Sequence, residues 1–233
     1  LKVFCTALYR AMGQGKNFMF RTAAGLVKVM GGITDIPLLE RKDMVSRETD
    51  MGGIVVVGSH TQKTTDQLRE LLTLNRVEGV HFHSNLVLQG EEAFEAEIGR
   101  AVNISEEIIR SGKTAVCYTD RNLLSVEHET KEEALLRSVR ISDGVQALVG
   151  RLTVTPAFVV AKGGITSSDI GTKALKVKRA DVMGQVKPGI PVWRTGGESK
   201  FPQTPYVIFP GNVGEVQTLK EVVQILTGED RDE

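Results

Sequence analysis

Apolar runs alternate with amphipathic stretches through the middle of the chain. Three runs of strand-forming residues are each followed by a stretch whose apolar side chains recur every three or four residues. The runs are residues 53–58 (GIVVVG), 77–83 and 114–118 (TAVCY), and the stretches are residues 64–74, 91–111 and 131–152. Strands that alternate with helices favour a mainly parallel sheet with flanking helices. The pattern predicts an α/β fold, and a break at residues 142–144 leaves open whether the third stretch forms one helix or two.

Residues 158–168 (FVVAKGGITSS) form the stretch around which the chain is organised. Its apolar run leads into a Gly-Gly turn, and residues 166–169 are N-cap candidates for a helix that runs to about residue 175. Glycines allow positive φ angles and a close approach of ligand, while a helix N-terminus attracts anions. The stretch predicts an anion site, with a phosphate as the first candidate.

The carboxyl-terminal part of the chain has shorter apolar runs, interrupted by turn residues. Apolar residues at 180–184, 191–195 and 206–209 are separated by Gly and Pro, and a helical stretch follows at residues 216–226. Such segments are typical of hairpins and irregular strands. We expect a shorter antiparallel or irregular layer added to the sheet.

The first fifty residues lack the regular alternation of apolar runs and amphipathic stretches. Residues 1–12 and 25–30 have helical spacing, residues 17–20 form a short strand-like run, and residues 33–52 have no clear period. A segment without a period, with mixed charges and a proline, is typical of a linker. We therefore expect a domain boundary near residue 50.

The expected division is residues 1–35 as the end of a preceding domain, residues 36–52 as a linker and residues 53–233 as the main domain. Leu1 is not an initiator methionine, and it falls within the first amphipathic stretch. We expect the chain to be a piece of a longer protein.

Charge and composition exclude several classes of partner. Lysine plus arginine equals aspartate plus glutamate, at 29 each, so no overall basic field attracts nucleic acid or anionic lipid. Aromatic residues make up only 5%, which leaves few side chains for stacking on single-stranded bases. No run approaches the roughly 18 apolar residues of a membrane span, and the first residues lack a signal peptide. We expect a cytoplasmic protein that binds neither nucleic acid nor membrane.

The two cysteines, Cys5 and Cys117, lie far apart in the sequence and match no metal-ligand or redox spacing. We expect two buried free thiols, which fits a reducing compartment.

Three turns rich in glycine or hydroxyl residues follow predicted strands. They are residues 58–61 (GSHT), 163–167 (GGITS) and 211–214 (GNVG). Parallel α/β sheets bind ligands beyond the carboxyl ends of their strands, so the three turns could meet in one cleft. Each turn taken alone is more often an ordinary tight turn. We therefore predict that the three turns converge on one cleft.

The turns match no standard nucleotide motif. Neither the Walker A pattern nor a G-x-G-x-x-G after a strand occurs. Ser59 lacks a nucleophile elbow and an identifiable His/Asp pair. We therefore predict that Ser59 is a hydrogen-bond donor and not a nucleophile. His60 is a site candidate by its position in the first turn.

Other polar residues are candidates for phosphate or substrate contacts. Lys162 could reach a phosphate, although a lysine that leaves a strand is more often a solvated edge residue. Arg21 opens a helix and could clamp an anion or be a surface charge. Asp169 could hold a metal, but a helix cap is the favoured interpretation. Ser167 and Asn212 complete this set.

His81 and His83 alternate along a predicted strand and therefore share one face. A zinc-type site needs further ligands, and no cysteine or carboxylate stands at a matching spacing. The sequence predicts no metal-ligand site.

Six motifs in order carry a resemblance to a known family. They are FRTAAGLV at 20–27, VVVGSHTQKTTDQL at 55–68, ISDG at 141–144, AKGGITSSDI at 161–170, QVKPGIPVW at 185–193 and FPGNVGEVQTL at 209–219. Together they resemble the four-carbon acid sugar kinase family, which covers tetronate and 3-oxo-tetronate kinases. The resemblance spans nearly the whole chain.

The resemblance implies that this chain is the carboxyl-terminal, ATP-binding domain with the end of the amino-terminal, substrate-binding domain. Its implied ATP contacts are Ser59, Gly163, Gly164, Ile165, Thr166 and Gly211. It also implies Mg²⁺ on the phosphates, a sugar acid as substrate, and a catalytic base in the amino-terminal domain outside these residues. Ile165 stands where the family usually has an acidic residue, and Phe209 where it has a basic one.

Two other functions stay open at this stage. One is a non-catalytic module that senses a phosphorylated metabolite or another anion, with the GGIT loop as the anion site. The other is a nicotinamide-dependent dehydrogenase, which the missing dinucleotide motif disfavours. The oligomeric state is open as well, with a homodimer as one candidate.

Overall fold

The computed structural model describes residues 1–45, 49–122, 124–126 and 128–229. The chain divides into two compact units, Leu1–Pro37 and Leu38–Glu233, and each is described by itself.

The smaller unit contains two expected helices, α1 (Lys2–Gly13) and α2 (Ala24–Met30). The Tyr9 hydroxyl donates a 2.5 Å hydrogen bond to the Met30 carbonyl and so joins them. The strand expected at residues 17–20 is wrong, because this segment has no regular structure and Met19 is fully exposed. A run with strand propensity needs a neighbouring strand to satisfy its backbone groups, and none pairs with it.

The segment expected to be a linker contains a short helix, α3 (Arg41–Met44), which begins with a capping box at Glu40. Met44 is fully buried in the core of the larger unit. The division at residues 35 and 52 stays a prediction, and residues 46–48 of the expected linker lie outside the described residues.

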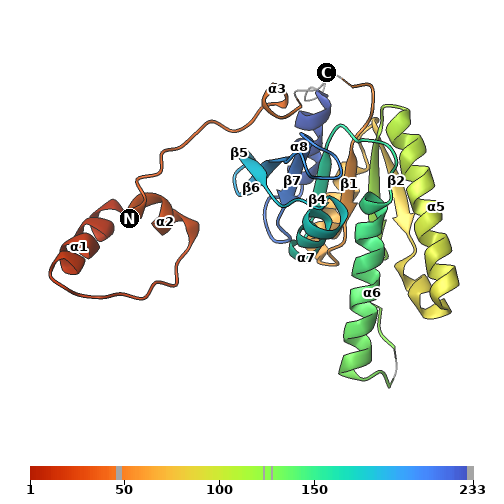
Figure 1. The fold of residues 1–233 in the computed structure, drawn as a ribbon, viewed down its shortest axis with the longest axis horizontal. Helices are drawn as coiled ribbons and strands as arrows, with labels where there is room; N and C mark the ends of the chain where they lie inside the picture. The colour runs from red at the N-terminus through yellow and green to blue at the C-terminus, as the bar shows by residue number, and fades with distance from the viewer. Residues whose placement is uncertain (46–48, 123, 127, 230–233) are drawn as a thin grey trace. The chain divides into compact units, whose positions relative to one another are not determined.

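The larger unit is built on one seven-stranded sheet with the order β2-β3-β1-β4-β7-β6-β5 (Figure 1). Its strands are β1 (Ile54–Val57), β2 (Val77–Phe82), β3 (Thr114–Thr119), β4 (Val159–Lys162), β5 (Ala180–Lys187), β6 (Ile190–Thr195) and β7 (Pro205–Phe209). The first five in that order run parallel, and β6 is antiparallel to both of its neighbours. The expected α/β class with an antiparallel addition is confirmed, and β7 joins the two parts.

Helices cover both faces of this sheet. The further helices are α4 (Gln62–Leu71), η1 (Ser84–Gln89), α5 (Glu91–Arg110), α6 (Lys131–Gly150), α7 (Gly164–Asp169), the π-helical segment η2 (Ile170–Ala174) and α8 (Thr218–Thr227). The helices α5 and α6 lie on one side of the sheet and α8 on the other (Figure 1). Side chains of α5, α6 and η2 form one core with alternate residues of β1, and side chains of α3, α4 and α8 form the other. All four residues of β1 are buried, because this central strand faces a core on each side.

The third amphipathic stretch is one continuous helix. α6 begins with a capping box between Thr130 and Glu133 and runs unbroken through residues 142–144. A methyl group at Gly144 would lie 2.6 Å from the Phe94 ring, so this glycine allows α5 and α6 to approach closely.

The N-cap expected at residues 166–169 is wrong. Gly163 is the N-cap, with a φ of 121°, and α7 begins at Gly164 directly after it. Asp169 is the last residue of α7 and accepts a 2.7 Å hydrogen bond from the Ser142 hydroxyl, so it caps no N-terminus. The turn is shorter than expected because a glycine with positive φ reverses the chain in a single step.

Both cysteines are free and buried, as expected. Burial raises the pKa of the Cys117 thiol to about 11, so this thiol is protonated at neutral pH and is no nucleophile. Within the described part of the chain, no helix combines the length and the apolar character that spanning a membrane requires.

Candidate functional site

The three turns predicted from the sequence lie against one another at the carboxyl edge of the sheet. A methyl group added to Gly211 would lie 3.9 Å from Gly163 Cα and 4.0 Å from Ser59 Oγ. One added to Gly58 would lie 2.4 Å from Thr166 Oγ1. The strands that end at these turns, β1, β4 and β7, are consecutive neighbours in the sheet. The predicted convergence therefore occurs, and glycines make it sterically possible.

Hydroxyl groups fix the first turn. Thr61 caps α4, accepting a hydrogen bond from the Thr64 backbone N–H at 3.3 Å. Its hydroxyl donates to Thr64 Oγ1 at 2.9 Å, and Thr64 Oγ1 donates to Ser59 Oγ at 3.3 Å. This chain holds the Ser59 side chain at the junction of the three turns.

Lys162 is a fully buried lysine beneath the third turn. Its ammonium group donates hydrogen bonds to the Pro210 carbonyl at 2.8 Å and the Gly211 carbonyl at 3.2 Å. It also lies 4.2 Å from the centre of the Phe209 ring. Burial, with a smaller contribution from the charge on Lys63, lowers its pKa to about 8, so it is positively charged at neutral pH. The solvated-edge interpretation of this residue is wrong, because its neighbours cover it completely.

Arg121 is a candidate site residue that the sequence analysis missed. Its guanidinium group donates to the Ser59 carbonyl, and its Nη1 is buried without a hydrogen-bond partner among the described residues. A buried guanidinium nitrogen without a partner is costly, and an anion would satisfy it. Its position two residues after β3 was a usable signal, because the carboxyl ends of parallel strands share one edge.

A cleft of about 530 Å³ opens beside the first two turns. Gly58, His60, Ile165 and Thr166 form one side of it. One face of α6 and the loop before it supply the other side, with apolar groups that include Leu124, Val126, Ile141 and Val145. Ile165 is 75% exposed, so its side chain stands free at the edge of this cleft. The cleft combines an apolar wall with polar backbone, as small-molecule sites do.

The remaining candidates lie in different settings. His60 has an exposed side chain whose ring lies 3.4 Å from the Thr119 hydroxyl. Partial desolvation of the ring, followed by the positive charge on Arg121, lowers its pKa. Asn212 is exposed in the third turn. The buried Ser167 hydroxyl donates to the Ala161 and Gly163 carbonyls at 2.9 and 2.7 Å, so it holds the Gly-Gly turn in place. Arg21 belongs to the smaller unit, and its expected role stays a prediction.

The family comparison agrees with this geometry. Residues 54–219 match the family described as a nucleotide-binding C-terminal domain, and the match includes all three turns. The chain belongs to this family. The resemblance drawn from the six motifs is thereby confirmed for the domain that it names. None of the curated proteins matches the chain.

Solved structures share the fold of this nucleotide-binding domain. A domain of unknown function from Bordetella bronchiseptica, solved with bound citrate as a domain-swapped dimer, is 20% identical with a TM-score of 0.58 over 76% of this chain. A putative tRNA synthase from Salmonella typhimurium is 15% identical with a TM-score of 0.56 over 81% of this chain. A Haemophilus influenzae protein is 16% identical with a TM-score of 0.51 over 75% of this chain.

The matched regions cover 41%, 42% and 40% of those three proteins. The chain therefore spans about two fifths of the length of these relatives.

Proposed function

We propose that this domain binds ATP for an ATP-dependent kinase that phosphorylates a hydroxyl group of a four-carbon sugar acid. The observation that carries the proposal is the contact between the turns at Gly58, Gly163 and Gly211 in a chain of the nucleotide-binding family. Phosphoryl transfer depends mainly on positioning and on neutralising charge. A site of backbone N–H groups with one buried lysine, Lys162, and one partly buried arginine, Arg121, suits that task.

In this proposal the phosphates of ATP lie at the junction of the turns. Backbone N–H groups of Gly164, Ile165 and Thr166 in the first turn of α7 and the hydroxyl group of Ser59 are the donors, and Lys162 supplies positive charge from below. The nucleoside occupies the adjacent cleft, where the exposed Ile165 side chain contacts the base. An apolar residue at this position thus supports base binding in place of the acidic residue usual in the family.

Mg²⁺ is expected to accompany ATP. The three turns contain no carboxylate, so the protein ligands that fit the ion best are hydroxyl groups such as those of Ser59 and Thr61. Mg²⁺ keeps several water molecules and binds substrate phosphates in many nucleotide sites, and bound there it would neutralise phosphate charge.

The sugar acid is proposed to bind to the remainder of the larger protein. Arg21, in the smaller unit, is the candidate clamp for its carboxylate, and the catalytic base is proposed to lie outside these residues. The Bordetella relative holds citrate, a carboxylic acid, which supports an acid as ligand of this family. That relative is also a domain-swapped dimer, which supports a homodimer for the whole protein.

The domain is expected to bind ATP more tightly than ADP, and ADP more tightly than AMP. Each phosphate adds charge-assisted hydrogen bonds at the turns, so each step is expected to change the dissociation constant by roughly 10-fold. Titration calorimetry of the folded chain with each nucleotide and Mg²⁺ measures the series. Absence of ATP binding at millimolar concentration, or equal affinity for all three, would contradict the proposal.

A non-catalytic sensor of a phosphorylated metabolite is the second candidate, and Ile165 in the GGIT loop is the observation that favours it. The two functions differ in turnover. The whole protein, given ATP, Mg²⁺ and a panel of four-carbon sugar acids, forms ADP if it is a kinase and binds without forming ADP if it is a sensor.

A further inference from the structure

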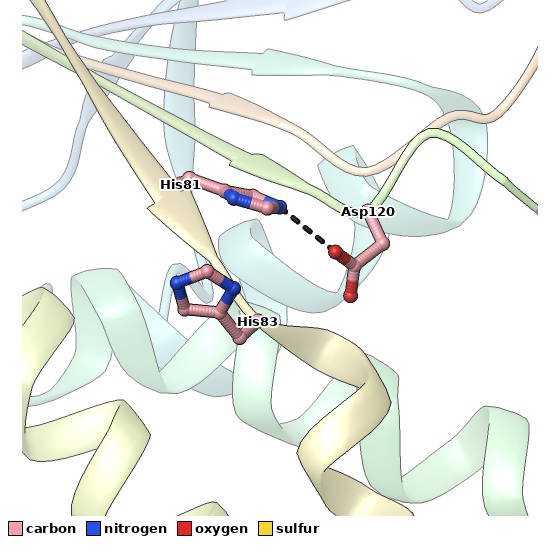
Figure 2. Close-up of side chains that lie close together, drawn as sticks. All are labelled: His81, His83 and Asp120. Atoms are coloured by element: carbon pink, nitrogen blue, oxygen red, sulfur yellow. Dashed lines mark hydrogen bonds and ion pairs between the residues drawn. The ribbon is translucent and has the colours of Figure 1, made fainter.

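A cluster of three metal-ligating side chains lies at the ends of β2 and β3. Ring nitrogens of His81 and His83 and a carboxylate oxygen of Asp120 lie within 4.8 Å of one another (Figure 2). The pairing of β2 with β3 sets Phe82 opposite Thr119, so Asp120 follows at the level of His83. The third ligand that the sequence lacked thus comes from the neighbouring strand.

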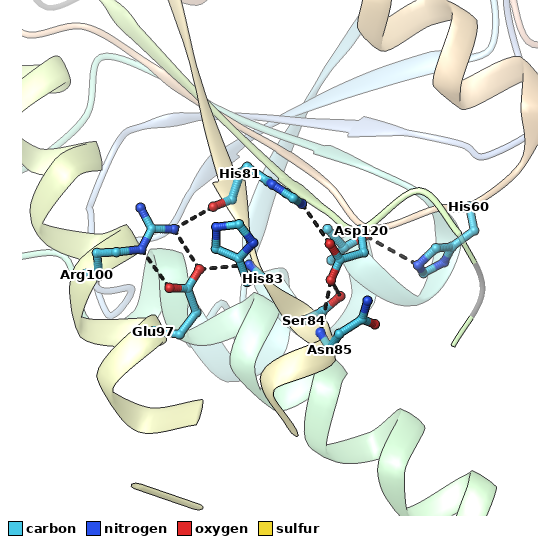
Figure 3. Close-up of polar contacts among 9 residues, drawn as sticks. His60, His81, His83, Ser84, Asn85, Glu97, Arg100 and Asp120 are labelled. Carbon is cyan, nitrogen blue, oxygen red and sulfur yellow. Dashed lines mark hydrogen bonds and ion pairs between the residues drawn. The ribbon is translucent and has the colours of Figure 1, made fainter. Parts of the chain in front are cut away.

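The Asp120 carboxylate is held in one orientation. Its Oδ2 accepts hydrogen bonds of 3.0 Å from the Ser84 hydroxyl and from the Asn85 backbone N–H (Figure 3). Its Oδ1 points at His81 Nε2, 2.8 Å away. One oxygen is therefore fixed by the protein, and the other faces the two imidazole rings.

The two histidines are positioned by their own neighbours. The His81 ring stacks on Tyr118 at 5.3 Å with an interplanar angle of 10°. The His81 carbonyl accepts a 2.6 Å hydrogen bond from Arg100, and the His83 backbone N–H donates to Glu97 at 2.7 Å (Figure 3). Glu97 is paired with Arg100 at 2.6 Å. Supporting contacts of this kind orient ligands in metal sites.

We infer that His81, His83 and Asp120 bind one divalent transition-metal ion of the zinc type. Two imidazole nitrogens and one carboxylate oxygen are ligands that zinc prefers, and they leave a fourth position for water or a substrate atom. Ligand atoms of a tetrahedral zinc site lie roughly 3.3 Å apart, given bonds of about 2.0 Å. The three atoms reach such spacing through small side-chain movements, chiefly of the exposed His83. Mg²⁺ and Ca²⁺ prefer oxygen ligands and do not suit the two imidazoles.

The cluster adjoins the proposed ATP site but shares no residue with it. It follows β2 and β3, whereas the turns follow β1, β4 and β7, and His60 lies between the two regions beside Thr119 (Figure 3). Metal binding is expected to occur without nucleotide, so its test is independent of the proposed function.

The test is titration of the chelator-treated chain with Co²⁺, followed by displacement with Zn²⁺. One Co²⁺ per chain is expected to bind, with the strong visible absorption of a four-coordinate ion. His83→Ala and Asp120→Asn are expected to weaken Zn²⁺ binding by more than roughly 100-fold, because loss of a direct ligand exceeds the 10- to 100-fold effect of a supporting residue. His128→Asn removes an exposed histidine outside the cluster and serves as the matched control, with unchanged affinity.

Several outcomes would overturn the inference. They are no binding at one ion per chain, unchanged affinity in His83→Ala, or an equal loss in His128→Asn. Preferential binding of Mg²⁺ over Zn²⁺ would also overturn it. His83→Ala changes an exposed side chain, so its circular dichroism spectrum should match that of the unchanged chain and keep the comparison interpretable.

Discussion

Gly163→Ala is expected to destabilise the domain by about 1–3 kcal/mol and to weaken ATP binding by at least roughly 10-fold. Gly163 has a φ of 121°, which strains any residue with a Cβ atom. The added methyl group would lie 3.3 Å from Thr166 Oγ1 and 3.5 Å from Ser59 Cβ, so relief of the strain must move the second turn away from the first. Urea denaturation measures the free energy of unfolding, and calorimetry measures the dissociation constant for ATP.

The neighbouring glycine supplies a matched control. Gly164 is helical, and a methyl group there would have no atom within 4 Å. Alanine in a helix is favoured over glycine by roughly 0.5–1 kcal/mol, so Gly164→Ala should leave stability unchanged or raise it. Equal destabilisation by the two substitutions would show that the strained turn at Gly163 is not the cause.

Lys162→Met is expected to weaken ATP binding by about 10- to 100-fold. A buried positive charge about 6 Å from a phosphate contributes roughly 3 kcal/mol at an effective dielectric constant near 20, which is about 100-fold. Methionine matches the apolar stem but donates no hydrogen bond to the Pro210 and Gly211 carbonyls. Calorimetry on both proteins at pH 7 measures the difference, and equal affinities would remove Lys162 from the proposed site.

The same residue gives a pH dependence with a defined sign. The pKa of Lys162 in the free protein is about 8, and a bound anion favours the charged form. ATP affinity should therefore fall as pH rises through 8, because the free protein has then lost the proton that binding requires. Lys162→Met should show a flat profile between pH 7 and 9, and so should differ from Lys178→Met, an exposed control that keeps the wild-type slope.

The stability of the wild-type fold should show the opposite trend and increase as pH rises. The folded pKa of Lys162 lies below its unfolded value of 10.5, so the cost of burying the charge is fully present below pH 8 and is relieved as pH rises toward 10.5. The free energy of unfolding of the wild-type chain should thus rise relative to that of Lys162→Met between pH 8 and 10 in urea denaturation. A constant difference across this range would contradict the assigned pKa.

Much of the fold was predictable because burial leaves a periodic signal in the sequence. The four apolar residues of β1 predicted a strand buried on both faces, and the spacing in residues 91–111 predicted the long helix α5. The errors concern residues whose role depends on a neighbour. Residues 17–20 have strand propensity but no partner strand among the described residues. The question left open at residues 142–144 also depended on a neighbour, because Gly144 serves close packing of the continuous helix α6 against Phe94.

The candidate site was predictable only in part. Its glycine-rich turns stood out because positive φ and close approach restrict the choice of residue, as at Gly163. The buried Lys162 and the partly buried Arg121 were not predictable as site residues, since lysine and arginine are residue types of an ordinary surface. Their roles follow from the carbonyl groups of Pro210, Gly211 and Ser59, which come from other strands.

The sequence by itself determined most of the strands and helices of the larger unit, and that residues 58, 163 and 211 lie in turns after strands. Periodicity reports which way each side chain faces along its own element, and that information is local. Only the tertiary structure decided that β1, β4 and β7 are neighbours, which brings Ser59, Gly163 and Gly211 together. The same is true of Asp120 beside His81, because strand order depends on the crossover connections and on the packing of helices against both faces.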